Sequence, residues 1–155
     1  MAEANREDVD LILRLYDMRR EPTMREARRF MIEEFYAENG KEFAEKYPPG
    51  SKENAYFRQA TSYWDMVGTF VKRGLLNKEL LFETSGEFHI FWEKAKAATQ
   101  DMRQARSNPL YLKNLEDLAA QHKAFMEQRS PGSSAFLASL NRPPALRPRR
   151  KNAAD

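Results

Sequence analysis

The stretch that decides the fold is residues 51–74, SKENAYFRQATSYWDMVGTFVKRG. On an α-helix, where successive side chains are about 100° apart, its large apolar side chains fill an arc of roughly 200°. These residues are Tyr56, Phe57, Ala60, Tyr63, Trp64, Met66, Val67, Phe70 and Val71. An apolar arc wider than half the cylinder needs neighbouring elements on several sides. The stretch therefore predicts the central helix of a bundle, at about residues 51–73.

Helix signals also flank the central helix on both sides. Capping residues, prolines and glycines separate expected helices at about 8–20, 22–39, 86–107 and 108–128, with short helical turns at 41–47 and 77–82. Ser51 is expected to cap the central helix, and Asn108 the helix at 108–128. No segment has the alternating pattern of a strand, and there is no internal repeat. We therefore expect an all-α fold, a compact bundle of five or six helices over residues 1–129. Residues 130–155, rich in proline and arginine, are expected to be a mostly disordered tail after one short docked turn.

The helix expected at about 8–20 carries apolar residues on two faces. One face holds Val9, Ile12, Leu13 and Tyr16, and the other holds Leu11, Leu15 and Met18. A helix of this kind is either covered on both sides within its own chain or contributes to an oligomer interface.

The basic character of the chain belongs to its C-terminal end. Of 26 basic and 23 acidic side chains, residues 141–155 hold five basic and one acidic, so the remainder is close to neutral. The sequence has no cysteine, which fits a reducing compartment. A polar N-terminus and short apolar runs predict neither secretion nor a membrane span, and we expect a cytoplasmic protein.

Several segments together resemble a bacterial all-helical domain family of unknown function, over about residues 9–120. They are residues 15–20 (LYDMRR), 55–66 (AYFRQATSYWDM), 74–82 (GLLNKELLF), Trp92 and residues 108–118 (NPLYLKNLEDL). In that family a helix before a Gly-Leu turn is followed by a tryptophan-bearing helix and then an aromatic-containing one. The resemblance implies a helical fold and brings no activity with it. Some members have an N-terminal membrane helix, a pattern from which this chain departs.

The sequence contains few motifs that could bind a metal or a cofactor. The two histidines, His89 and His122, belong to neither an HExxH nor an ExxH motif, and no glycine-rich phosphate loop is present. His122 is in helical register with Leu115 and Leu118, so we expect it to be partly buried and His89 to be partly exposed. We predict no metal and no cofactor.

The candidate polar strip lies on the central helix, at Arg58, Ser62, Asp65 and Thr69. Asp65 beside Trp64 is the best candidate for an enzymatic carboxylate in a restricted pocket. The same strip is also what an ordinary amphipathic helix presents to water.

Basic residues form two candidate anion-binding sets. One surrounds the first helix junction, with Arg19, Arg20, Arg25, Arg28 and Arg29; the other is in the tail, with Arg147, Arg149, Arg150 and Lys151. Glutamates four residues from Arg25 and Arg29 favour a salt-bridged face instead of a ligand site, and a solvated tail is the alternative for the second set.

No motif assigns an activity, so the preferred hypothesis is a non-enzymatic protein-interaction or scaffolding module that binds a protein partner or itself. The alternatives are nucleic-acid or anion binding through the basic sets, and an enzyme that uses Asp65.

Overall fold

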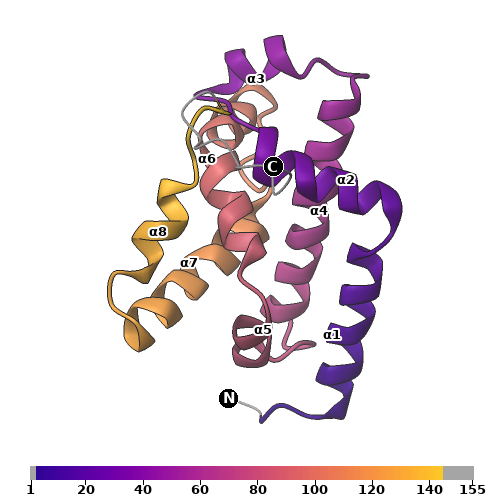
Figure 1. The fold of residues 1–155 in the computed structure, drawn as a ribbon, viewed down its shortest axis with the longest axis vertical. Coiled ribbons are helices and arrows are strands. Elements are labelled where there is room, and N and C mark those ends of the chain that lie inside the picture. Colours follow the sequence, from indigo (N-terminus) through magenta and orange to yellow (C-terminus); the bar gives the residue numbers. More distant parts are fainter. Residues whose placement is uncertain (1–2, 145–155) are drawn as a thin grey trace, which may run out of the picture.

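The structure, a computed structural model, describes residues 3–144, which form eight α-helices and one π-helical turn without a strand (Figure 1). The elements are α1 (Arg6–Arg19), α2 (Pro22–Arg29), η1 (Phe30–Glu34), α3 (Gly40–Lys46), α4 (Lys52–Lys72), α5 (Lys78–Thr84), α6 (Glu87–Ala105), α7 (Lys113–Arg129) and α8 (Ser133–Ser139). The all-α prediction is confirmed. The helices number eight instead of five or six because the short segments α3, α5 and α8 are separate helices.

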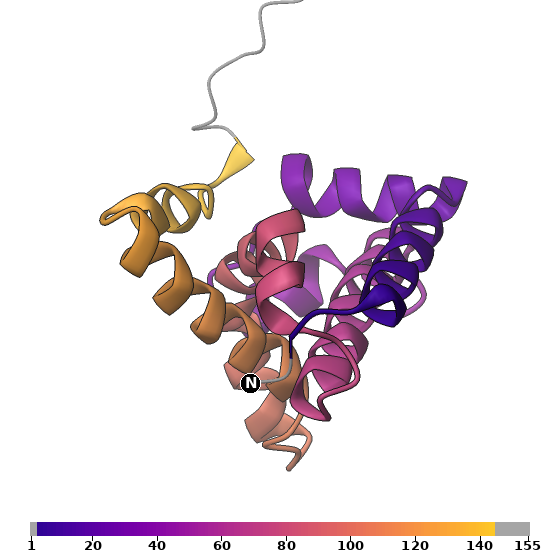
Figure 2. The same ribbon diagram turned by 90° about the horizontal axis from the view of Figure 1, so that it is seen from below.

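Helix α4 is the centre of the bundle, as its wide apolar arc predicted. It packs against α2, α6 and α7 (Figure 1). Its side chains Phe57, Ala60 and Val67 are fully buried. Thr61 belongs to the polar arc but is equally buried, because its hydroxyl donates to the Phe57 carbonyl oxygen 2.7 Å away. Helices α1 and α8 lie on opposite sides of the molecule (Figures 1 and 2).

The second expected helix ends earlier than predicted, at Glu34 instead of about residue 39. After the π-helical turn, Phe35 has an extended backbone and a fully buried side chain. Its ring lies 5.2 Å from that of Phe57 and 5.4 Å from that of Tyr47. The free energy gained by burying the Phe35 ring is larger than that of one further helical turn. The chain therefore leaves the helix at this point.

Helix α7 begins later than predicted, and a different residue caps it. We expected Asn108 to cap this helix, but the Asn108 side chain accepts the Leu110 N–H within the preceding turn. The helix starts at Lys113, after Leu112 with a left-handed φ of 54°. Asp65 of α4 accepts the Leu115 N–H at 2.9 Å, so a carboxylate from another helix satisfies this terminus.

Helix α1 buries one residue from each of its two apolar faces, Ile12 and Leu15, and leaves the rest of both faces exposed or half-buried. Asp8, Ile12 and Leu15 face the bundle, whereas Val9 and Leu13 are exposed. None of the helices described between residues 3 and 144 is long and apolar enough to span a membrane.

Candidate functional site

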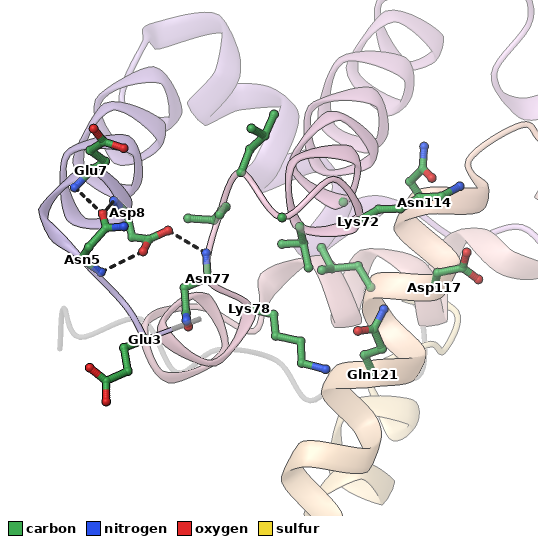
Figure 3. A pocket seen from close by; sticks show the side chains of 16 residues that line it. Glu3, Asn5, Glu7, Asp8, Lys72, Asn77, Lys78, Asn114, Asp117 and Gln121 are labelled. Atoms are coloured by element: carbon green, nitrogen blue, oxygen red, sulfur yellow. Dashed lines mark hydrogen bonds between the residues drawn. The ribbon is translucent and has the colours of Figure 1, made fainter. Parts of the chain in front are cut away.

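The largest cavity lies where the start of α1, the end of α4 and the first half of α7 meet, and it has a volume of about 610 Å³ (Figure 3). Carboxylates and lysines both line it, over an apolar surface that includes Val71, Leu76 and Leu118. The charged side chains are Glu3, Glu7, Asp8, Lys72, Lys78 and Asp117. This mixture of charges gives the cavity no clear preference for an anion or a cation.

Asp8 in this cavity is a structural residue. Its carboxylate accepts the backbone N–H of Asn5 at 2.9 Å and that of Asn77 at 2.7 Å (Figure 3). The first bond completes the cap of α1 together with the Asn5 side chain, and the second holds the residue that caps α5. Asp8 therefore joins the beginnings of two helices. Within residues 3–144, no group of three or more histidine or acidic side chains is placed to hold a metal ion.

The structure divides the predicted polar strip of α4 into two halves. Asp65 and Thr69 are half-buried beneath the start of α7, where Thr69 Oγ1 accepts a hydrogen bond from Asn114 Nδ2 at 3.0 Å. Arg58 and Ser62 are exposed and line a second cavity of about 510 Å³. The helix thus uses one half of the strip for packing and leaves the other open.

Two residues of this second cavity were missed by the sequence analysis. Arg106 and Tyr111 belong to the segment between α6 and α7, and they line the cavity together with Arg58. The Arg106 guanidinium lies 5.0 Å from the centre of the Tyr111 ring. No signal in the sequence connects them with Arg58, since the fold alone brings that segment to α4.

The arginines of the first helix junction do not form one patch. Arg19 and Arg28 both contact the buried carboxylate of Glu87, at 3.2 and 2.8 Å, and Trp64 Nε1 donates to it at 3.1 Å. Arg29 pairs with Glu34 at 2.7 Å and with Glu26 at 3.0 Å.

Only part of the junction is free of carboxylates. Arg20 and Arg25 are exposed, and no carboxylate of residues 3–144 lies within 4.0 Å of either. Glu21, the expected partner of Arg25, accepts the Met24 N–H and caps α2. The tail residues Arg147, Arg149, Arg150 and Lys151 lie outside the described residues.

The two histidines form a buried pair, with their Nδ1 atoms 3.0 Å apart. His89 was expected to be partly exposed; this prediction is wrong, because its ring is turned toward His122 and is 2% exposed. Burial, aided by the neighbouring His89, lowers the pKa of His122 to about 4. None of the described cavities is lined by both His122 and Asp65.

Comparison with known proteins gives a family and no activity. The family model described as "Domain of unknown function (DUF4760)" matches residues 6–122, from the start of α1 into α7. No curated protein and no solved structure is significantly similar to the chain. Since the match covers most of the chain and confirms the resemblance to a helical family without an assigned activity, the protein belongs to the DUF4760 family.

Proposed function

We propose that the protein is a non-enzymatic interaction module that self-associates through α1. The observation that carries this proposal is a stripe of exposed apolar side chains on that helix. Val9, Leu13 and Tyr16 are 45%, 58% and 37% exposed. Burying apolar surface of this kind between two chains is the main driving force of association.

The stripe is continuous and accessible. Its members are spaced by four and then three residues, so they follow one face of the helix for two turns. Helix α1 is held to the bundle by the neighbouring part of its surface, through Ile12 and Leu15, and it lies at the edge of the molecule (Figures 1 and 2). A partner helix therefore has access to the stripe without any rearrangement of the core.

The charges beside the stripe favour a second copy of the same chain as the partner. Arg6 and Asp10 lie in the first half of α1, and Asp17 and Arg20 lie at its end. Within residues 3–144 none of these four side chains has an ion-pair partner within 4.0 Å. In an antiparallel pair of α1 helices related by a two-fold axis, each half of the helix faces the opposite half of its partner. Each end of the pair then holds two arginines and two aspartates, so the charges of the two copies balance one another.

The test is the oligomeric state of the full chain, measured by sedimentation velocity over a series of protein concentrations. We expect a reversible dimer, and we expect Leu13→Glu to weaken it by at least about tenfold because a charge enters the apolar contact. Leu110→Glu is the matched control, since Leu110 is 72% exposed but lies between α6 and α7. A strict monomer at all concentrations, or equal effects of both variants, contradicts the proposal.

Two other functions have less support. Nucleic-acid or anion binding at the helix junction would depend on Arg20 and Arg25, because Arg19 and Arg28 both contact Glu87 and Arg29 contacts Glu26 and Glu34. An enzyme built on Asp65 would use a carboxylate that already accepts the Leu115 N–H. For each of these functions we propose a cytoplasmic location, because a sequence without cysteine fits a reducing compartment.

A further inference from the structure

The cavity between α4 and the segment joining α6 to α7 carries two arginines that have no acidic partner among residues 3–144. It has a volume of about 510 Å³, and Arg58 and Arg106 lie in its wall with Ser62 and Tyr111. We propose that this cavity binds a phosphoryl group through Arg58 and Arg106. The proposal is independent of self-association, which concerns α1.

Both guanidinium groups retain free donors. Arg58 Nε donates to Asn54 Oδ1 at 3.1 Å, and Arg106 lies over the ring of Tyr111. No carboxylate of residues 3–144 lies within 4.0 Å of either arginine, whereas Arg19, Arg28, Arg29, Arg103 and Arg129 each have one. An arginine has five N–H donors, so most donors of this pair are available to a ligand.

Tyr111 and Ser62 add neutral donors to the same wall. Burial raises the pKa of the Tyr111 phenol, while the guanidinium groups of Arg106 and Arg58 act in the opposite direction. The phenol is therefore protonated at neutral pH, and both arginines are close enough to influence it. The Ser62 hydroxyl makes only a long contact, 3.4 Å, with the Gln59 carbonyl oxygen. A hydroxyl held this weakly can turn toward a ligand.

The number and kind of donors indicate a doubly charged, tetrahedral anion. Two guanidinium groups balance the two charges of a phosphate dianion, and their planar arrays of N–H groups suit its oxygens. Asp65 contributes an opposing negative charge near Tyr111, but its carboxylate is held at the start of α7 by the Leu115 N–H. The cavity also has apolar wall residues, Ala55 and Leu112, and its size is in the range of small-molecule sites. A free phosphate ion and the phosphoryl group of a small phosphomonoester both fit this description.

The test is an NMR titration of the full ¹⁵N-labelled chain, first with inorganic phosphate and then with phenyl phosphate, following the side-chain Nε–H signals of the arginines. We expect saturable shifts of the Arg58 and Arg106 signals. Arg58→Gln and Arg106→Gln should each weaken binding by about tenfold, because each removes a charge-assisted contact. Arg106→Lys, which keeps the charge but loses the planar group, should also weaken binding.

Arg73→Gln is the matched control. Arg73 is exposed at the end of the same helix, lines none of the described cavities and has no ion pair with residues 3–144, so its loss removes one charge outside the site. Tighter binding of phenyl phosphate than of phosphate would assign the site to phosphomonoesters, and equal affinity would assign it to free phosphate. Shifts that do not saturate, or an equal loss of affinity in Arg73→Gln, would overturn the proposal. So would unchanged binding by Arg58→Gln and Arg106→Gln with unaltered melting temperatures.

Discussion

At the scale of single residues, Glu87 accounts for two of the five arginines at the first helix junction, Arg19 and Arg28. Its side chain is 8% exposed at the start of α6, and it accepts from Arg28 Nε at 2.8 Å and from Trp64 Nε1 at 3.1 Å. Arg19 lies 3.2 Å from the same carboxylate and 5.2 Å from the centre of the Trp64 ring. The anion that this cluster binds is thus part of the protein. Removing the negative charge of a buried carboxylate destabilises the fold, because its arginine partners are then left with an uncompensated positive charge.

We predict that Glu87→Gln lowers the free energy of unfolding by about 2–4 kcal/mol. The amide oxygen of glutamine can still accept the hydrogen bond from Trp64. The loss of stability therefore measures the removal of the negative charge that faces Arg19 and Arg28. Urea denaturation followed by tryptophan fluorescence measures it. The control is Glu26→Gln, which removes an exposed partner of Arg29 and should change stability by less than about 0.5 kcal/mol. Equal effects of the two substitutions would contradict a buried role for Glu87.

At the scale of elements, the contact between α4 and α7 depends on a glycine. A Cβ atom at Gly68 would lie 2.5 Å from the backbone oxygen of Asn114, which leaves no room for a side chain. On either side of this approach, Asp65 holds the Leu115 N–H and Thr69 holds the Asn114 amide. The apolar arc of α4 predicts that the helix has neighbours, but it does not predict how closely one of them approaches.

We expect Gly68→Ala to destabilise the protein by about 1–3 kcal/mol, because the two helices must move apart. The sign is informative, since alanine in a helix interior is otherwise favoured over glycine by up to about 1 kcal/mol. Ser62→Ala is the control on an exposed part of the same helix and should leave stability within about 0.5 kcal/mol. Thermal unfolding monitored by circular dichroism distinguishes the two. A gain in stability for Gly68→Ala would show that α4 and α7 are not in close contact.

At the scale of the whole molecule, the buried side chain of His122 makes stability depend on pH. The pKa of His122 is about 4 in the folded protein and about 6.5 in an unfolded chain. Between these values the unfolded chain binds the proton and the folded protein does not, so acidification favours unfolding. The contribution of His122 is complete above pH 6.5 and is lost as the pH falls toward 4. Glu93, whose pKa is lowered to about 2 by hydrogen bonds with His89 and Lys96, adds a loss that begins below about 4.5.

We therefore predict that the free energy of unfolding falls by about 2–3 kcal/mol between pH 7 and pH 4.5. His122→Asn should flatten this dependence, whatever its effect on stability at neutral pH. Urea unfolding curves at several pH values measure both slopes. A control substitution at an exposed acidic residue, Glu45→Gln, should leave the slope above pH 5 unchanged. An identical slope in the wild-type protein and in His122→Asn would contradict the assignment.

The sequence predicted the helices better than their ends. Periodicity and caps are local signals, so α4 and its apolar face followed from residues 51–74, and the cap at Ser51 is confirmed. The predicted helix ends were wrong where a residue distant in the chain makes the deciding contact. Phe35 leaves its helix to pack in an aromatic cluster with Phe57. At the start of α7, Asp65 takes the capping role expected of Asn108. The candidate strip was half predicted in the same sense, because Arg58 and Ser62 are open whereas Asp65 and Thr69 are covered.

The sequence by itself determined the helical class and the central helix, because both depend on residues close together in the chain, and it determined the family through motifs spread over residues 6–122. Only the tertiary structure decided which charges meet. It placed Glu87 between Arg19 and Arg28, left Val9 and Leu13 uncovered, and brought Arg106 to the cavity of Arg58. The physical reason is that helical periodicity orients side chains around one axis, whereas contacts between helices depend on their crossing and spacing, which side chains far apart in the chain set together.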